Sequence, residues 1–442
     1  MTDTAPHHSH LENFERLAAR AQDADWIARL RQSAIERFAQ AGYPADNDEE
    51  WRFTNLRPIA QTGFDPAQPC DMTADGIAPY TIGDDAGAEL VFVNGLFAPQ
   101  LSHARQVGRG VQVDNLEMTL AVSSWVQRHL ARYASIRANP FVALNTAFLA
   151  DGAAIHLDRN TALDRPIHVL HYFSGDDVPA VAHPRVLLVL EEGASAQLLE
   201  TWAGSDGAYW TNAVTEVVAG DSARVEYCKL VQEGPQARHL GTTQFRLGRA
   251  AELLSTVVSM GGQLVRNDVN VVLDGQGAAA SLNGLTVIAD HQHVDNHTLL
   301  DHAKAQCPSR ELYKAVLADH ATGVFKGKIL VRPDSQKTDS KQTSRTLLLS
   351  DDAAMNSQPA LEIYADDVKC THGSTTGPLD EEQVFYLRSR GVELDAARHM
   401  LIYAFAAQIT GQMGIAPARR RIEGIMAARH GLPSDMQVAG NK

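Results

Sequence analysis

The chain has 442 residues, and 39 Lys plus Arg against 53 Asp plus Glu give it a formal net charge of −14 at pH 7. This charge excludes a protein that binds nucleic acids non-specifically, because such binding needs positive charge to displace the counterions of the phosphates. Hydrophobic residues make up 44% of the chain and charged residues 21%, which indicates a folded protein with a substantial core.

The sequence also bears on the compartment. It contains no run of about eighteen apolar residues, and its start lacks the basic and apolar regions of a secretory signal. The four cysteines match neither a dense disulfide framework nor a Cys-x-x-Cys metal site. They are Cys70, Cys228, Cys307 and Cys370. We therefore expect a cytoplasmic protein with reduced thiols and no membrane partner.

Residues 1–150 are assigned to an N-terminal helical region and a connecting segment. Between Leu11 and Gly42, apolar residues recur at steps of three and four, which is typical of an amphipathic helix, and Asp25 can cap its start. These apolar residues are Ile27, Leu30, Ala34 and Phe38. The connecting segment is expected to contain a short strand at Leu90 to Val93 and a helix around Ser123 to Tyr133.

Residues 151–377 form a β region, because short runs rich in Val, Ile, Leu and Thr alternate with Gly, Asp and Asn turns. Four similar turns open at Gly193, Gly220, Gly248 and Gly275, with spacings of 27, 28 and 27 residues. Turns that return at a nearly constant interval predict the stacked coils of a β-helix or a similar solenoid. A large sandwich with evenly spaced turns is the alternative, and the later turns at Gly323 and Asp352 do not keep the spacing.

Residues 378–442 are predicted to form a small helical domain. Asp380 begins a capping box, Gly391 ends the first helix, a second helix begins near Asp395, and a third spans Ala418 to Arg429. The position of this domain beyond the β region favours either a docking surface or a cap on the end of the solenoid.

Common catalytic motifs are missing from the sequence, so we predict no catalytic residue and no ATP hydrolysis by this chain. It contains no His-Glu-x-x-His and no Gly-x-Ser-x-Gly motif. The nearest look-alike of a phosphate loop contains Gly323, Gly327 and Lys328, but its spacing is wrong, and Ile329 replaces the hydroxyl residue that would bind magnesium.

Two groups of residues could bind a metal ion. The first is a run whose polar side chains share one face of an extended strand, namely His291, His293, Asp295 and His297. Neighbours on such a face lie about 7 Å apart, so a straight strand cannot bring all four to one ion. We therefore interpret this run as a hydrogen-bonded ladder rather than a zinc or iron site.

The second group is Cys370 and His372, which share a strand face just before a Gly-rich segment. A thiolate and an imidazole suit iron or zinc, but two ligands leave a tetrahedral ion half-coordinated. The other ligands would have to come from elsewhere, for example from a partner chain. Without further context, a structural thiol and an exposed imidazole are the simpler interpretation.

Several long segments resemble a known family, the SufD subunits of the SUF (SufBCD) iron-sulfur cluster assembly scaffold. The segments are EEWRFTNL at 49–56, HVDNHTLLDH at 293–302, SRELYKAVLADHATGVFKGKILVRPDSQKTDSKQT at 309–343, and the block from LLLSDD at 347 to RSRGV at 392. The resemblance extends over nearly the whole chain. It implies a mainly β protein with a right-handed parallel β-helix core between N-terminal and C-terminal α-helical regions.

The resemblance also implies a function, that of a non-catalytic scaffold subunit. In that family the β-helix pairs with the subunit SufB, and the C-terminal helices bind the ATPase SufC. Cys370 and His372 match the Cys-x-His sequence at the SufB–SufD interface. They would thus contribute to the site of a nascent iron-sulfur cluster, assembled transiently with thiolate and carboxylate groups of SufB, and this chain alone would hold no permanent cofactor.

Three alternatives remain open at this point. One is a stand-alone SufD homodimer, which would form through the same strand edge, and another is a SufB-like scaffold. The third is a β-helix carbohydrate-active enzyme, because that architecture hosts paired carboxylates in a groove. Its candidate carboxylates would be Asp351, Asp352, Asp366 and Asp367.

Overall fold

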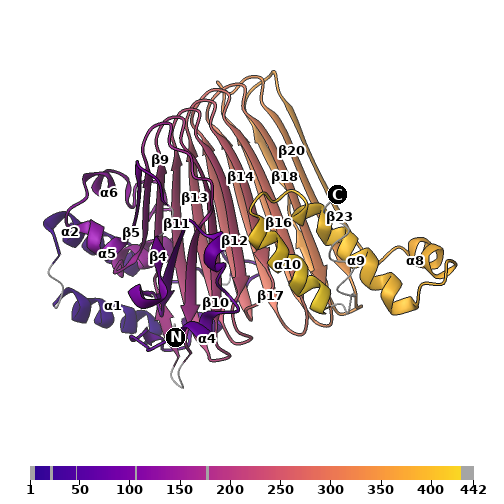
Figure 1. The fold of residues 1–442 in the computed structure, drawn as a ribbon, viewed down its shortest axis with the longest axis horizontal. Coiled ribbons are helices and arrows are strands. Elements are labelled where there is room, and N and C mark those ends of the chain that lie inside the picture. Colours follow the sequence, from indigo (N-terminus) through magenta and orange to yellow (C-terminus); the bar gives the residue numbers. More distant parts are fainter. Residues whose placement is uncertain (1–4, 20–22, 46, 105–106, 176–178, 430–442) are drawn as a thin grey trace.

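The protein is a parallel β-solenoid with helices packed on its two outer faces (Figure 1). A computed structural model describes residues 5–19, 23–45, 47–104, 107–175 and 179–429. Successive coils contribute strands alternately to a 12-stranded sheet, here called sheet A, and to an 11-stranded sheet, here called sheet B. The expectation of a mainly β fold with a stacked-coil core between helical regions is confirmed.

The N-terminal region supplies helices and a few strands. Its elements are α1 (Ala5–Ala18), α2 (Asp25–Ala41), α3 (Arg57–Ala60), β1 (Asp65–Pro66), α4 (Ala74–Ile77), the 3-10 helix η1 (Gly83–Asp85), β2 (Ala88–Val93), β3 (Leu96–Phe97), the 3-10 helix η2 (Pro99–Leu101), β4 (His103–Ala104), β5 (Val111–Asn115), α5 (Leu116–Leu120), α6 (Ser124–His129) and α7 (Pro140–Ala147). The expected strand at 90–93 and the helix near 123–133 are both present. Asp25 is not the cap that the sequence suggested, because Ala24 holds the cap position and Asp25 is the first helical residue.

The solenoid strands follow one another from sheet to sheet. Sheet A contains β6 (Gly152–Leu157), β8 (Ala180–Ala182), β9 (Arg185–Leu190), β11 (Tyr209–Ala219), β13 (Arg238–Leu247), β15 (Leu264–Leu273), β17 (His293–His302), β19 (Thr322–Val331), β21 (Ala354–Ser357) and β22 (Ala360–Ile363). Sheet B contains β7 (Ile167–Phe173), β10 (Ser195–Gly204), β12 (Arg224–Gln232), β14 (Glu252–Ser259), β16 (Ala279–Ile288), β18 (Pro308–Leu317), β20 (Asp339–Leu348) and β23 (Lys369–Gly377). All of these strands pair in parallel, so the apolar residues of alternate positions meet inside the coils.

The first of the four predicted turns is out of register with the others by two residues. Ser195 pairs with Arg224, so Gly193 stands level with Ser222 rather than with Gly220. Each coil places one residue with positive φ at this level, and its N–H donates to a carbonyl in the turn of the next coil. These residues are Asn160, Gly193, Ser222, Ala250, Gly277, Gln306 and Lys337.

The repeat therefore continues beyond the four turns found from glycines, because residues other than glycine occupy the left-handed position in most coils. Gly323, expected in a turn, lies instead within strand β19. The number of residues between paired positions of neighbouring coils changes along the solenoid, from 27 between β14 and β16 to 31 between β18 and β20. A search for one fixed spacing therefore does not find the later coils.

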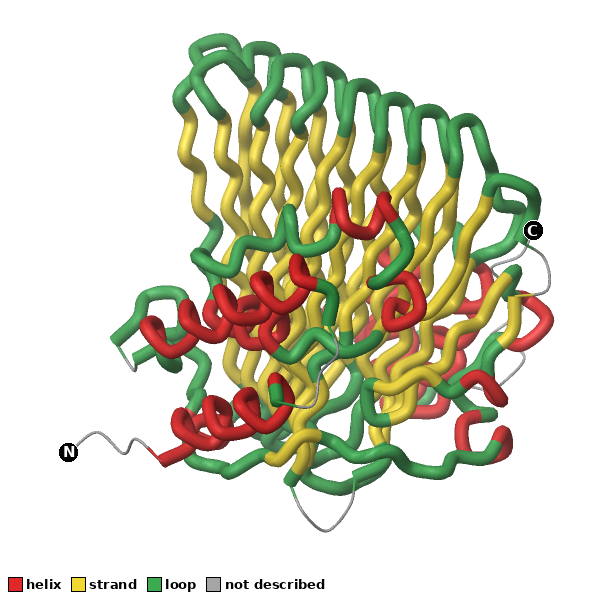
Figure 2. The backbone as a smooth tube through the Cα atoms, turned by 90° about the vertical axis from the view of Figure 1, so that its left-hand side faces the viewer, coloured by secondary structure: helices red, strands yellow, loops and turns green. Residues whose placement is uncertain are grey.

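Helices cover the two sheets on opposite sides. On the outer face of sheet A, α1, α2 and α7 pack against Trp210, Leu240 and Leu264. From the side shown in Figure 2, the N-terminal helices lie across the lower part of the strands. The core of the molecule thus has one layer inside the coils and further layers beneath the helices.

The C-terminal helices are α8 (Glu381–Arg388), α9 (Leu394–Thr410) and α10 (Ala416–Arg429), close to the predicted ranges. Asp380 caps α8 by accepting a hydrogen bond from the N–H of Glu382 at 2.9 Å, as the sequence predicted. Helices α9 and α10 pack on the outer face of sheet B, against β10 to β18, rather than over the end of the solenoid. Helix α8 extends beyond the last coil (Figure 1). Within the described ranges, no helix has the length and apolar character needed to cross a membrane.

Candidate functional site

Strand β23 is the last strand of sheet B. Among the described strands it pairs only with β20, so its second hydrogen-bonding edge is open. Most residues of β23 are exposed, whereas every residue of β6 in the first coils is buried. An open edge of this kind is a template for pairing with another chain.

Cys370 and His372 lie on the face of β23 that points into the last coil. Cys370 stands level with Ser340 of β20, and His372 stands level with Gln342. The direction of this face is fixed by Ser374, whose hydroxyl donates to Ser357 Oγ across the coil at 2.8 Å. Because β23 ends its sheet, the inward face of this strand is partly open to solvent.

The chemistry of the pair is that of an incomplete metal site. Cys370 is half-buried, and burial together with the nearby charge of Asp339 raises the pKa of its thiol. His372 is exposed. In the part of the chain that the structure describes, no three His, Cys, Asp or Glu side chains are grouped so that they could hold a metal ion. Cys370 and His372 therefore offer two ligand atoms and need others from outside.

Two polar columns continue from this pair into the solenoid. Behind Cys370, the hydroxyls of Ser340 and Ser309 are hydrogen-bonded at 2.6 Å. Behind His372, Gln342 Nε2 donates to Glu311 Oε2 at 2.6 Å. Burial raises the pKa of Glu311 to about 7. These residues were not predicted from the sequence, because the steps of 30 and 31 residues that connect them differ from the 27 and 28 residues between the glycine turns.

The histidine run is a hydrogen-bonded ladder, as expected. His293 Nε2 lies 2.9 Å from Thr54 Oγ1, and its Nδ1 lies 2.6 Å from Thr322 Oγ1. His291 is not part of the ladder, because it lies in the preceding turn and stacks on His320 with ring centroids 4.9 Å apart. The ring nitrogens of His293 thus contact side chains of this chain, and the ring of His291 stacks on another ring of this chain.

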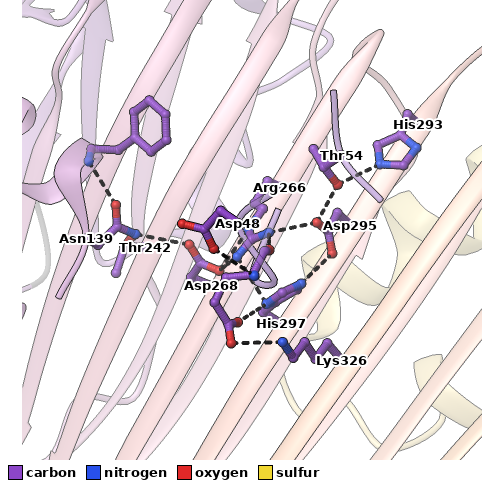
Figure 3. Close-up of polar contacts among 12 residues, drawn as sticks. Asp48, Thr54, Asn139, Thr242, Arg266, Asp268, His293, Asp295, His297 and Lys326 are labelled. Carbon is purple, nitrogen blue, oxygen red and sulfur yellow. Dashed lines mark hydrogen bonds and ion pairs between the residues drawn. The ribbon is translucent and has the colours of Figure 1, made fainter. Parts of the chain in front are cut away.

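Around the ladder, the structure forms a charged cluster on the outer face of sheet A (Figure 3). Arg266 is 3% exposed and binds Asp268 and Asp295, each at 2.9 Å. His297 Nε2 lies 3.0 Å from Asp295 Oδ1. Burial opposes the charged form of His297, but the carboxylate of Asp295 outweighs this effect, so the pKa of His297 is raised.

This cluster fastens the segment EEWRFTNL to the solenoid. The backbone carbonyl of Glu50 accepts a hydrogen bond from Arg266 Nη1 at 2.6 Å, and Glu50 Oε1 lies 2.8 Å from Lys326 Nζ. The hydrogen bond between the Glu50 carboxylate and His297 is the main reason why the pKa of Glu50 is lowered to about 2. Trp51 covers the guanidinium of Arg266, whose Cζ lies 3.9 Å from the ring centroid. A cavity of about 370 Å³ borders the cluster.

The other candidate residues do not form a site. Asp352 lies in the turn before β21, with Oδ2 3.7 Å from His320 Nδ1. Asp367 lies in the turn before β23 and is paired with Lys337. The carboxylates nominated for carbohydrate cleavage are therefore divided between two turns, where Asp352 lies near His320 and Asp367 forms an ion pair with Lys337.

Comparisons with known proteins identify the family of the chain. Residues 171–405 match the family described as "SUF system FeS cluster assembly, SufBD core domain", and residues 8–169 match the "SufBD protein N-terminal region". The chain is 31% identical to the iron-sulfur cluster assembly protein SufD of Escherichia coli, over 86% of this chain and 87% of that protein.

Other relatives give the same result. A SufBD family protein of Synechocystis is 30% identical over 91% of both chains. A SufBD family protein of Mycobacterium leprae is 32% identical over 88% of this chain and 90% of that protein. The solenoid with helices on both faces is thus that of an assembly protein of the SUF system.

More narrowly, the chain belongs to the SufBD family of iron-sulfur cluster assembly proteins, and it is similar to SufD. The predicted resemblance is confirmed.

Proposed function

We propose that this chain is a non-catalytic, cytoplasmic scaffold subunit on which an iron-sulfur cluster is built transiently, with Cys370 and His372 as its ligands. The observation that carries the proposal is their position on the inward face of β23, at an open edge of the solenoid. The cluster is cargo, and a second subunit supplies the remaining ligands.

The second subunit is a β-helix protein of the SufB type, which pairs through the open edge. A solenoid of the same kind could continue the ladder of β23 and close the last coil. Closure would exclude water from the half-buried thiol of Cys370 and bring thiolate or carboxylate groups of the partner within reach. A second copy of this chain could use the same edge, but it would bring a second Cys-x-His rather than a different ligand set.

Helix α8 is the proposed docking element for an ATPase of the SufC type. Phe385 and Tyr386 are 74% and 56% exposed, and they lie on a helix that extends beyond the last coil (Figure 1). Large exposed aromatic side chains are typical anchors of protein interfaces. Movement of α8 by the ATPase would be passed to sheet B through α9, which is fixed by the hydrogen bond of Lys314 Nζ to the carbonyl of Phe405 at 2.8 Å.

The ligand role is tested by His372→Ala in the chain co-expressed with its β-helix partner and the ATPase. We expect the iron and sulfide content of the purified complex to fall about tenfold or more, as is usual when a metal site is damaged. The outward-facing Thr371→Ala is the matched control and should keep both the cluster and the complex. An unchanged cluster content in His372→Ala would contradict the role.

The partners are tested separately. Phe385→Asp should abolish co-purification of the ATPase while the β-helix partner remains bound, because the substitution places a charge in the proposed apolar contact. Recovery of the chain only as a homodimer, in the presence of both partners, would overturn the proposed complex.

A further inference from the structure

Behind His372, the buried amide of Gln342 has an oxygen, Oε1, that accepts no hydrogen bond from the described residues. We propose that Gln342 is a positioning residue for His372: its Oε1 accepts a hydrogen bond from one ring nitrogen, which turns the other nitrogen toward the arriving metal. This inference rests on the proposed function, because it assigns a support to one of the proposed ligands.

The register places the two side chains next to each other. Gln342 and His372 are level on adjacent parallel strands, and both point into the coil. Gln342 is 1% exposed. Its Nε2 donates to Glu311, while its Oε1 has no partner among the described residues. An unsatisfied buried acceptor destabilises the fold, so a donor that reaches it gains a matching advantage.

The opposite wall of the coil is shaped to hold this amide. Gly327 lies across from Gln342, and a Cβ at that position would come within 2.2 Å of Gln342 Nε2. Glu311 is 3% exposed, and its ionised carboxylate, which can only accept hydrogen bonds, binds the NH₂ end of the amide. The oxygen of Gln342 is thus held in one orientation by residues from two other strands.

The column behind Cys370 differs, because its hydroxyls are already engaged. Ser340 is hydrogen-bonded to Ser309, and Ser309 Oγ also lies 3.1 Å from His302 Nε2. Of the two residues directly behind the ligands, only Gln342 is left with an unpartnered acceptor in the described structure.

The direction of the hydrogen bond decides which nitrogen binds metal. Gln342 belongs to the preceding coil, so a ring N–H that points to it points back along the solenoid. The other nitrogen then points out of the open end, toward the subunit that closes it. Metal-binding histidines usually donate their second ring N–H to a carbonyl or carboxylate, and loss of that acceptor typically weakens metal binding 10–100-fold.

The test uses Co²⁺ as a probe for the full-length chain in complex with its β-helix partner. Its sulfur-to-cobalt charge-transfer absorption reports binding at Cys370 when the absorption is lost in Cys370→Ser. We expect Gln342→Met to weaken Co²⁺ binding 10–100-fold. Thr346→Val is the matched control, because Thr346 Oγ1 is also buried and unpartnered on β20 but stands beside Thr376. This control should bind Co²⁺ like the native chain.

An exchange of the two buried side chains separates positioning from packing. The double variant Glu311→Gln, Gln342→Glu keeps their hydrogen bond and keeps an acceptor oxygen beside His372, so it should regain most of the affinity. Native affinity in Gln342→Met, equal weakening in Thr346→Val, or no recovery in the double variant would overturn the role of Gln342.

The same measurement distinguishes failure of the proposed function from failure of the inference about Gln342. If the complex of the native chain with its β-helix partner shows no cobalt absorption that depends on Cys370, both proposals are overturned. If that absorption is present and is unaffected by substitution of Gln342, the pair of ligands stands and only the inference about Gln342 is removed.

Discussion

The two ends of the solenoid are built in opposite ways. At the first coils, β5 adds to β6 in antiparallel fashion, and β3 and β4 add to β2, so the chain itself covers the edges. At the last coil, β23 has no partner beyond β20 among the described strands, and its inward face carries Cys370 and His372. The first end is therefore completed by this chain, whereas the last end is left open in the described structure and is where the proposed partner would pair.

The contrast also appears in how charge is handled. Near the first end, Arg185 and Glu216 are both fully buried, and their side chains are joined at 2.7 Å. Glu216 also accepts hydrogen bonds from the N–H groups of Ala131, Tyr133 and Ala134 at 2.8 to 2.9 Å. Near the last end, Arg310 and Asp339 form a pair that is about half exposed. Removing one partner of a buried ion pair strongly lowers the stability, because the other charge stays buried without a partner. Exposed ion pairs contribute little to the stability.

The largest expected effect follows from breaking the first of these pairs. Glu216→Gln leaves the Arg185 guanidinium buried without a counter-charge and should lower the free energy of unfolding by about 3–5 kcal/mol. Asp339→Asn at the other end should cost less than about 1 kcal/mol. Urea unfolding of both variants measures the difference. Equal losses would remove the contrast between the ends.

The second prediction concerns the segment EEWRFTNL, which the charged cluster holds on the outer face of sheet A. No described segment covers the last strand of sheet B in this way. His297→Asn removes a charged group held by Asp295 and should cost about 1.5–3 kcal/mol near pH 6. The pKa of His297 is raised in the folded chain, so its contribution is fully present below the unfolded value of about 6.5 and is lost as the pH rises through the folded value.

The native chain should therefore lose stability relative to His297→Asn as the pH increases above about 6.5. Urea unfolding at a series of pH values measures this difference. The loosening of the segment around Glu50 should be visible as faster hydrogen exchange there. A constant difference between the two proteins across this range would show that His297 is not charged in the fold.

The sequence allowed the coils to be predicted, but not their register. Four glycine turns revealed the repeat, yet Gly193 was placed two residues from its true level because Ser222 fills the left-handed position in the next coil. That position tolerates several residue types when hydrogen bonds between coils hold it, so no residue type marks it in the sequence.

The candidate site shows the same limit. Alternation along a strand sufficed to put Cys370 and His372 on one face. The residues behind them depend on coil lengths: His372 stands level with Gln342, which stands level with Glu311, at steps of 30 and 31 residues. These steps differ from the 27 and 28 residues between the early glycine turns. Only the structure could connect the columns.

The third prediction compares packing inside the coils with packing at the open end. At Gly284, a Cβ would come within 2.1 Å of the ring of Tyr313, so Gly284→Ala should cost about 1–3 kcal/mol through overpacking. The measurement is the shift in the urea midpoint. Retained stability would mean that Tyr313 can move and that the interior is looser than the contacts indicate.

The smallest effect is expected at Gly373, which directly follows the proposed ligand His372. A Cβ there would meet nothing within 4 Å, and the backbone of this residue is not in the left-handed region. Gly373→Ala should therefore leave the stability of the isolated chain within about 0.5 kcal/mol or raise it slightly, because glycine weakens a strand. In the complex, the added methyl group faces outward on the strand that the partner must join. Unchanged stability of the chain together with weaker co-purification of the β-helix partner would show that the open end is shaped for another molecule. A loss of stability in the isolated chain would show instead that this chain closes the end by itself.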